Sequence, residues 1–303
     1  MNENEPMDYQ PLYFKPGYTP HALPDKNMYP NAVKELAMPA LATPLGPDFK
    51  NMNDLFGGFR PHEFSILCGA TGTGKTTLVA NWSAQMLKQG VRHFVASVET
   101  GPTDFVKRVI SVYAGQDWNT GLPVPLAKLM DFDSKHSTVF NSGYLQLSLY
   151  DNRFSVDTLM ADIEWMVDQQ GIEIAFIDNL NFFLEVSTAQ NQVIEMDRAT
   201  HKLVMFCKRV PVHVVMVMHP KKTDNGRVES EFDIKGSSTA VQEAHNVFLF
   251  NRPSEYQIKN DIAESNDREL KIAKLRRRGI SVGKSILLKT TDGVKYQEKA
   301  ILG

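Results

Sequence analysis

From residue 64 onward, the chain alternates short apolar runs with longer stretches whose apolar positions recur every three or four residues. Short runs rich in β-branched residues are typical of strands buried on both faces, and the recurring pattern is typical of helices that cover a sheet. The alternation predicts an α/β fold in which crossover helices connect a mostly parallel sheet. The predicted strands are residues 64–68, 93–98, 145–150, 172–177, 212–218, 247–250, 269–274 and 285–288, the last as a late antiparallel piece.

Three helices of this pattern have clear ends. One begins near Leu78 and stops at Gly90, where a glycine favours the left-handed conformation that ends many helices. A second covers residues 156–167 and has Ser155 as its N-cap. A third spans residues 193–208, and the helical spacing of its apolar side chains predicts that they belong to the core.

The first 45 residues have a different character. Six prolines between Pro6 and Pro30 interrupt any long helix or central strand there. We therefore expect residues 1–45 to form an extended arm and residues 46–303 to form one folded domain. The apolar residues of the arm need a surface to cover them, and a neighbouring subunit could supply it by a swap of arms.

Composition excludes several classes of protein. The chain of 303 residues is 42% hydrophobic and 22% charged with a formal net charge of -2, which excludes disorder throughout and a globally basic nucleic-acid-binding surface. Cys68 and Cys207 have neither a disulfide pattern nor metal-ligand spacing. The acidic, polar start and the short apolar runs predict neither a signal peptide nor a membrane span, so we expect a cytoplasmic protein.

The strongest chemical signal is a G-x-x-x-x-G-K-T motif between a predicted strand and a predicted helix. Glycines let backbone N–H groups surround the β- and γ-phosphates of a nucleotide, the lysine reaches those phosphates, and the final threonine can bind Mg²⁺. The motif predicts a binding site for ATP. Its residues are Gly69, Ala70, Thr71, Gly72, Thr73, Gly74, Lys75 and Thr76, and Thr77 follows directly.

Polar side chains follow three of the predicted strands, at the edge where the phosphate loop also lies. Asp178 is the expected second ligand of Mg²⁺ beside Thr76, although an aspartate can also serve as a turn residue there. Glu99 fits two roles, a base for the water that attacks the γ-phosphate or a carboxylate near a helix N-terminus. His219 could sense the γ-phosphate or be a structural histidine.

Seven motifs in the same order resemble the ATPase domain of the hexameric replicative helicases, the DnaB-like group of the RecA-like ATPases. The resemblance is nearest to the mitochondrial Twinkle and phage primase-helicase branch and covers roughly residues 45–290. The motifs are GGFRP at 57–61, GATGTGKT at 69–76, SVET at 97–100, FIDNLNFF at 176–183, MHPKK at 218–222, DIKGSS at 233–238 with Gln242, and KLRRRG at 274–279. This resemblance implies a RecA-like P-loop ATPase core.

The resemblance also implies roles for individual residues. It makes Glu99 the catalytic base, His219 the sensor of the γ-phosphate, and Arg276 a finger that stabilises the transition state in the adjacent subunit. Lys274 and Arg276 alternate along a predicted strand, so we expect both to point at one neighbouring phosphate group and Arg277 to point to the opposite face. The alternative is a solvated basic strand end.

In this family, DNA contacts come from loops that line a central channel. The matching stretch here is residues 220–238, in which acidic residues alternate with basic ones. We expect the basic side chains to contact DNA phosphates, with an ordinary solvated loop as the alternative. They are Lys221, Lys222, Arg227 and Lys235.

The resulting prediction is a homo-oligomeric ring, with a hexamer expected, that uses ATP and Mg²⁺ to move 5′ to 3′ on single-stranded DNA during replication. Primase, polymerase and single-strand-binding protein are candidate partners. Two alternatives stay open: a recombinase- or repair-type ATPase that forms filaments on DNA, and a regulatory ATPase without motor activity.

Overall fold

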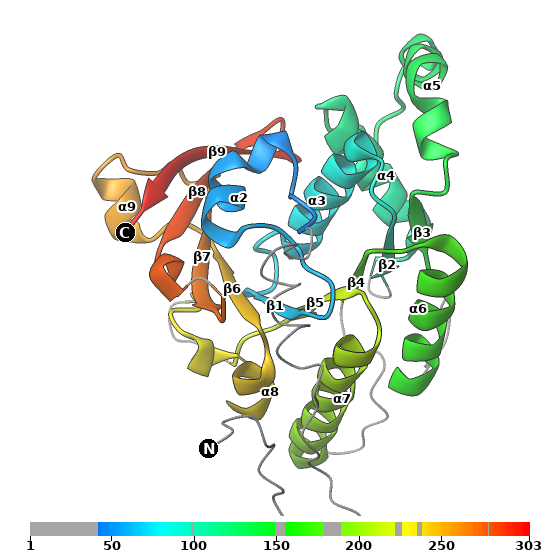
Figure 1. The fold of residues 1–303 in the computed structure, drawn as a ribbon. Helices are drawn as coiled ribbons and strands as arrows, with labels where there is room; N and C mark the ends of the chain where they lie inside the picture. The colour runs from blue at the N-terminus through cyan, green and yellow to red at the C-terminus, as the bar shows by residue number, and fades with distance from the viewer. Residues whose placement is uncertain are drawn as a thin grey trace, which may run out of the picture. The chain divides into compact units, whose positions relative to one another are not determined.

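The computed structural model describes residues 42–97, 100–148, 155–178, 189–221, 226–234, 238–277 and 279–303, all of which belong to one unit, Leu41–Gly303 (Figure 1). Its strands are β1 (Phe64–Cys68), β2 (His93–Ser97), β3 (Leu145–Leu147), β4 (Ile174–Asp178), β5 (His213–Met218), β6 (Asn246–Asn251), β7 (Arg268–Leu275), β8 (Ser285–Thr291) and β9 (Lys295–Leu302). Its α-helices are α2 (Lys50–Phe56), α3 (Lys75–Gln89), α4 (Pro102–Ala114), α5 (Leu126–Phe140), α6 (Val156–Gln170), α7 (Ala189–Arg209), α8 (Ser238–Glu243) and α9 (Glu255–Lys259). Short 3-10 turns cover Pro47–Phe49, Glu231–Asp233 and Gly279–Ser281.

All nine of these strands form one sheet in the order β3-β2-β4-β5-β1-β6-β7-β8-β9. The pairs from β3 to β6 are parallel, and those from β6 to β9 are antiparallel. The strand before the phosphate-binding motif, β1, lies between β5 and β6 in the interior of the sheet. The prediction of an α/β fold with a mostly parallel sheet and flanking helices is therefore confirmed.

Successive side chains of the central strands enter two separate cores. In β4, Ile174 and Phe176 join the core that contains α2, α3 and α4, whereas Ala175 and Ile177 join the core that contains α6 and α7. This alternation follows from the two-residue repeat of a strand, and it explains why every position of β1, β2, β4, β5 and β6 is buried. Figure 1 shows these helices on the two sides of the sheet.

The helices end where the sequence supplies capping residues. Ser155 precedes α6 and its side chain accepts a hydrogen bond from Thr158 N, as the sequence predicts. Gly90 follows α3 with φ +70°, and its N–H donates to Leu87 O. The first cap marks the start of α6, and the second marks the end of α3, before the chain enters β2.

The sequence prediction locates most strands but misses the hairpin at the end of the chain. The predicted strand 285–288 is β8, which continues to Thr291 and pairs with β9, a strand that we did not predict. Asp292 and Gly293, which lie between β8 and β9, both have positive φ, as a tight hairpin turn requires. The β9 strand escaped prediction because most of its positions are partly or fully exposed and carry polar residues.

Candidate functional site

The phosphate-binding loop connects β1 to α3 at the carboxyl edge of the parallel strands, where open α/β sheets bind their ligands. Gly69 N donates to Met218 O of β5, and a Cβ on Gly69 would lie 2.4 Å from Phe250 O of β6. Gly72 and Gly74 have φ of +75° and +95°. A side chain on Gly69 would collide with the neighbouring backbone, and the positive φ of Gly72 and Gly74 is unfavourable for any residue with a Cβ.

Lys75 is the first residue of α3 and is only 6% exposed. Its Nζ donates to Gly69 O at 2.7 Å and to Ala70 O at 3.1 Å, and it lies 3.4 Å from His219 Nδ1. Thr73 Oγ1 also donates to Ala70 O. The loop thus holds the ammonium group over its own backbone, at the helix N-terminus where a nucleotide phosphate is favoured.

The two residues predicted to bind a metal ion are in direct contact. Thr76 Oγ1 donates to Asp178 Oδ2 at 2.7 Å, and Asp178 is 2% exposed at the end of β4. Within the described ranges, no group of three or more His, Cys, Asp or Glu side chains could hold a metal ion alone. One hydroxyl and one carboxylate suit Mg²⁺, which takes its other ligands from water and nucleotide phosphates, so the residues present fit this ion.

The two remaining predicted groups of the nucleotide site follow β5 and β2, the strands on either side of β4. His219 directly follows β5, and its Nδ1 lies 3.5 Å from Thr71 Oγ1 of the phosphate loop. Glu99 lies outside the described residues, so the structure does not describe its side chain. The strand before it ends at Ser97, which pairs in register with Asp178.

Lys274 and Arg276 lie at the opposite, amino edge of the parallel strands. Leu275, the last residue of β7, pairs with Asn246, the first residue of β6, and β6 runs parallel to β1. Arg276 N donates to His245 O at 3.0 Å. The prediction that Lys274 and Arg276 share one strand is wrong in detail, because β7 ends at Leu275 and Arg276 is the first residue beyond it.

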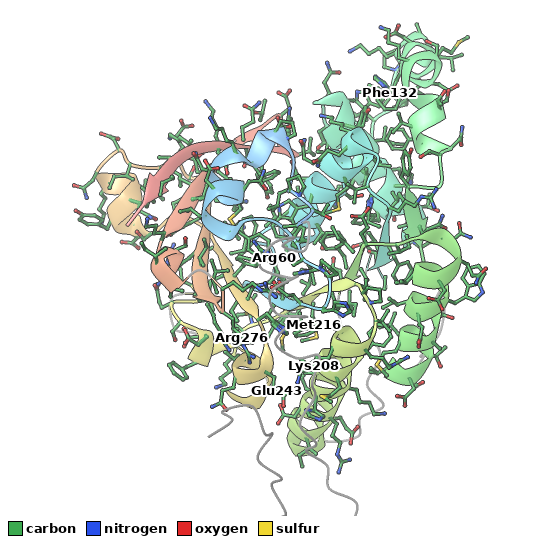
Figure 2. The ribbon with its side chains drawn as sticks, viewed as in Figure 1. Arg60, Phe132, Lys208, Met216, Glu243 and Arg276 are labelled. Atoms are coloured by element: carbon green, nitrogen blue, oxygen red, sulfur yellow. The ribbon has the colours of Figure 1, made fainter. Side chains whose placement is uncertain are left out.

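Both side chains nevertheless reach the same place, the carbonyl end of α8, and Figure 2 shows Arg276 close to Glu243 there. Lys274 Nζ donates to Val241 O at 2.8 Å and to Gln242 O at 2.7 Å. Arg276 donates to Gln242 O at 2.7 Å and to Glu243 O at 3.1 Å. Burial, and then the nearby guanidinium of Arg276, lowers the pKa of Lys274. Two adjacent cationic side chains therefore donate hydrogen bonds to backbone carbonyl groups at the C-terminal end of α8.

Comparison with known proteins decides the family. A sequence profile of the DnaB-like helicase C-terminal domain matches residues 45–292. The chain belongs to this family. The resemblance inferred from the motifs is therefore confirmed, and membership in this family implies that the domain binds a nucleotide.

The chain is also similar to individual proteins of known sequence or structure. The chain is 23% identical over 225 residues to a DNA helicase/primase of Enterobacteria phage T3, a match that covers 70% of this chain and 39% of that protein. Among solved structures, a DnaB-like replicative helicase described with its interactions with primase has a TM-score of 0.72, with 15% identity over 91% of this chain and 67% of that one. A second structure, an ATPase domain, has a TM-score of 0.70 with 15% identity and covers 90% and 97% of the two chains.

Three residues that the motifs did not indicate complete the nucleotide cleft of this DnaB-like domain. Arg108 of α4 donates to Thr77 Oγ1 at 3.0 Å, and Arg268 of β7 donates from Nε to Thr73 O at 2.7 Å. Tyr296 of β9 also lines the cleft, and burial raises its pKa. The cleft has a volume of about 360 Å³ and is lined by Thr71, Gly72, Gly74, Lys75, Thr76, Thr77, Thr100, Arg108, Asp178, His219, Arg268, Gly293 and Tyr296.

The candidate DNA-contacting residues have different surroundings. Lys221 is exposed, and its Nζ donates to Phe232 O at 2.8 Å. Arg227 forms ion pairs with Glu229 at 3.0 Å and with Glu269 at 2.9 Å, and its side chain is only 16% exposed. These two carboxylates favour a structural role for Arg227 over the predicted contact with DNA. The two other candidates, Lys222 and Lys235, lie outside the described residues.

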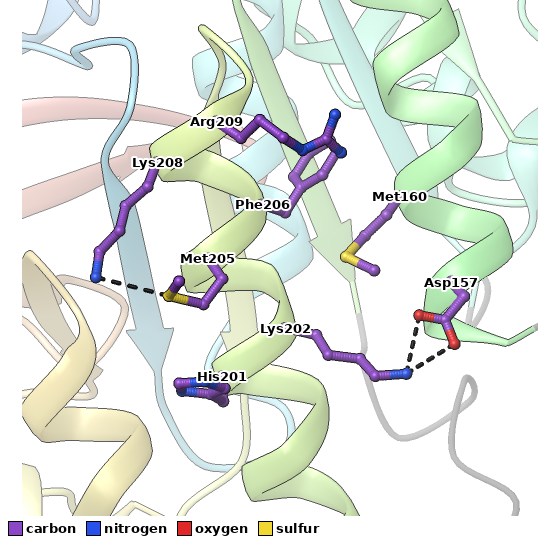
Figure 3. Close-up of a pocket in the computed structure, with 8 residues that line it drawn as sticks. All are labelled: Asp157, Met160, His201, Lys202, Met205, Phe206, Lys208 and Arg209. Carbon is purple, nitrogen blue, oxygen red and sulfur yellow. Dashed lines mark hydrogen bonds and ion pairs between the residues drawn. The ribbon is translucent and has the colours of Figure 1, made fainter. Parts of the chain in front are cut away.

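A larger groove of about 660 Å³ lies between α6 and α7, away from the nucleotide cleft (Figure 3). Met160, Met205 and Phe206 supply apolar surface, and Lys202 forms an ion pair with Asp157 at 2.7 Å on one side of the groove. The groove and the nucleotide cleft share no lining residue. Its size therefore does not make it the nucleotide site.

None of the helices in the described ranges is long and apolar enough to span a membrane.

Proposed function

We propose that this protein is an ATP-driven ring motor that moves 5′ to 3′ on single-stranded DNA and displaces the complementary strand during DNA replication. One observation carries the proposal: the phosphate-binding loop and the cations Lys274 and Arg276 occupy opposite edges of one sheet in a DnaB-like ATPase domain. The proposal requires ATP, Mg²⁺, single-stranded DNA and identical neighbouring subunits, with a hexamer as the expected assembly.

The separation of the two edges explains why neighbouring subunits are needed. Arg276 lies level with the start of β1, and the phosphate loop begins at the other end of this strand, after the fifth residue of β1. At a rise of ~3.3 Å per residue, the two places are ~17 Å apart, which is beyond the reach of an arginine side chain. Arg276 can therefore serve a nucleotide only in another subunit, and hydrolysis depends on assembly. A subunit rotation that closes on itself gives a ring.

Within one subunit, each group of the cleft has a separate task. The backbone N–H groups of the loop and the Lys75 ammonium bind the phosphates, and Thr76 and Asp178 would hold Mg²⁺. When bound, Mg²⁺ neutralises charge on the β- and γ-phosphate oxygens. Glu99, two residues beyond the end of β2, takes a proton from the attacking water, and the guanidinium of the neighbour's Arg276 stabilises the charge that spreads over the transferred phosphoryl group.

We propose that His219 reports the state of the nucleotide to the DNA. Its ring contacts Lys75 and Thr71 of the phosphate loop, and the next residue, Pro220, pairs with Ile234 in an antiparallel bridge. A movement of His219 would therefore move the segment that begins with Lys221. We propose that Lys221, Lys222 and Lys235 contact backbone phosphates of the DNA and pass them from subunit to subunit.

Other features of the assembly are part of the same proposal. The expected arm, residues 1–45, would contact a neighbouring subunit through the part before Leu41, because Leu41–Gly303 form one unit in which Leu45 is buried. Primase, polymerase and single-strand-binding protein are the partners that such a motor would meet, in the cytoplasm of the cell or, for a phage protein, of its host.

ATP hydrolysis by the purified protein, with and without single-stranded DNA, tests the proposal at several protein concentrations. We expect DNA to stimulate hydrolysis, the rate to rise more than linearly with protein, and Lys75→Ala and Arg276→Ala to be inactive. Lys289→Ala, in β8, serves as the control for loss of a lysine outside the nucleotide cleft. Hydrolysis that ignores DNA and survives Arg276→Ala would instead identify a regulatory ATPase. Electron microscopy with a non-hydrolysable ATP analogue separates rings from filaments.

A further inference from the structure

The start of β1 carries a buried carboxylate that the nucleotide site does not use. Glu63 directly precedes β1, and its side chain is only 4% exposed. Its Oε2 accepts a hydrogen bond from Asn246 Nδ2 at 3.1 Å. Its Oε1 is buried without a hydrogen-bond partner in the described part of the chain, but Arg277 Nε lies 2.9 Å away as an ion-pair partner. A carboxylate so far from water is costly unless a cation faces it.

That cation belongs to the residue next to Arg276. The two arginines leave the end of β7 in different directions, because Arg277 turns to Glu63 whereas Arg276 turns to the carbonyl groups of Gln242 and Glu243. The backbone of Arg276 is also fixed, since its N–H donates to His245 O. The Glu63 ion pair thus gives the chain at Arg276 and Arg277 a second anchor besides the carbonyl groups of α8.

His245 leaves this arrangement undisturbed. Its ring Nδ1 accepts a hydrogen bond from Phe64 N at 3.1 Å, and its backbone N–H donates to Phe64 O. Burial lowers the pKa of His245, with Glu63 opposing and Arg276, Lys208 and Arg277 adding to the shift. The imidazole is therefore neutral at neutral pH and does not compete with Arg277 for the carboxylate.

We propose that Glu63 is a positioning residue for Arg276 and acts through its ion pair with Arg277. The inference rests on the proposed function, in which Arg276 serves the nucleotide of a neighbouring subunit. It gives β1 two roles, because the strand carries the phosphate loop of its own subunit at one end and the anchor of the finger at the other. Each β1 would then join two consecutive nucleotide sites of the ring.

The effect of Glu63 on the finger can be separated from an effect on folding. Arg277 is 67% exposed whereas Glu63 is 4% exposed, so the cost of an unpaired buried carboxylate arises in Arg277→Gln and not in Glu63→Gln. In Glu63→Gln, the amide oxygen can still accept from Asn246, and the variant no longer buries a charge. We therefore expect a melting temperature close to that of the parent and an unchanged KM for ATP, with kcat lowered about tenfold, a small part of the ~10³–10⁵ that an arginine finger contributes.

The decisive experiment traps a transition-state analogue without turnover. Fluorescent mant-ADP with aluminium fluoride reports whether the finger is in place, because the analogue carries the charge that the finger stabilises. Glu63→Gln and Arg277→Gln should trap at least about tenfold less analogue than the parent while they bind mant-ADP normally. Glu164→Gln is the matched control, because it removes another carboxylate–arginine pair, with Arg209, on α6 and α7.

Mixed assemblies then show in which subunit the defect lies. Glu63→Gln subunits are co-purified through two different tags with Lys75→Ala subunits, which lack a working nucleotide site but keep an intact finger. Trapping should return in this mixture, as it should for Arg276→Ala mixed with Lys75→Ala. Normal trapping by Glu63→Gln alone would overturn the inference. It would also be overturned if Lys75→Ala subunits restored trapping to Arg276→Ala but not to Glu63→Gln. Failure of the Arg276→Ala mixture would instead refute the proposed sharing of sites between subunits.

Discussion

The close fit of the phosphate loop against β9 makes a quantitative prediction for two glycines. Gly72 and Gly74 both have positive φ, but their surroundings differ. A Cβ on Gly74 would lie 2.5 Å from Tyr296 Oη, whereas a Cβ on Gly72 would have no atom within 4 Å. Replacement of each by alanine therefore separates the cost of the backbone conformation from the cost of the collision.

The expected costs follow from these distances. An alanine in the left-handed region costs about 1–2 kcal/mol, so Gly72→Ala should lower the free energy of unfolding by that amount. Gly74→Ala has the same backbone cost and also forces the buried Tyr296 side chain to shift, which adds about 1–3 kcal/mol. Tyr296→Phe removes the colliding oxygen. A double-mutant cycle should then show a favourable coupling of about 1–3 kcal/mol between Gly74→Ala and Tyr296→Phe.

Urea denaturation gives the free energy of unfolding of each variant, and mant-ATP binding reports on the loop itself. Nucleotide affinity should fall in Gly74→Ala and partly return in the double variant. Gly72→Ala combined with Tyr296→Phe is the control, and these two changes should be additive. Equal costs for the two alanine variants, or a coupling energy within error of zero, would refute the reasoning from the contact between the loop and β9.

Three further predictions concern single side chains. Asp178→Asn should keep nucleotide binding but lose most Mg²⁺-dependent hydrolysis. The amide can still accept the hydrogen bond from Thr76, but it carries no charge for the ion. Hydrolysis at the parent rate would contradict this prediction. Arg108→Gln should weaken mant-ATP binding several-fold, whereas the exposed Lys107→Gln on the same helix should not, and equal effects would show that Arg108 has no special place in the cleft. Burial raises the pKa of Glu269, but hydrogen bonds from Ser285, Arg227 and Gln257 outweigh it and hold the pKa below the ordinary value of 4.5. The contribution of Glu269 to stability is present above pH 4.5 and is lost as pH falls through the lower pKa of the folded state. In urea denaturation, the free energy of unfolding of Glu269→Gln should therefore depend less on pH in this range than that of the parent. An equal pH dependence would contradict the assignment.

The parts of the site that the sequence predicts correctly are local in the chain. The strand, loop and helix around Lys75 follow one another directly, so the motif and the hydrophobic pattern describe the same structure. Asp178 follows from the same logic, because parallel strands bring their carboxyl ends to one edge. Sequence pattern suffices where the geometry is fixed by a strand and the residues directly after it.

The parts that it misses depend on contacts between distant segments. Tyr296 enters the cleft from β9, whose mixed polar pattern does not indicate a strand. Arg108 lies on a helix whose buried side chains suggest packing only, and Arg227 is held by a carboxylate 42 residues further along the chain. Charge and spacing in the sequence cannot tell a solvated cation from one that a distant carboxylate has already neutralised.

Unwinding of a forked DNA substrate tests the central claim most directly. The fork carries a fluorophore and a quencher on its two strands, and its tails are varied so that only the 5′ tail, only the 3′ tail or both are present. With ATP and Mg²⁺, we predict strand separation on substrates with a 5′ tail, none on those with only a 3′ tail, and none with Lys75→Ala or Arg276→Ala. Strand separation that needs only the 3′ tail, or DNA-stimulated hydrolysis without separation of any fork, would contradict the account.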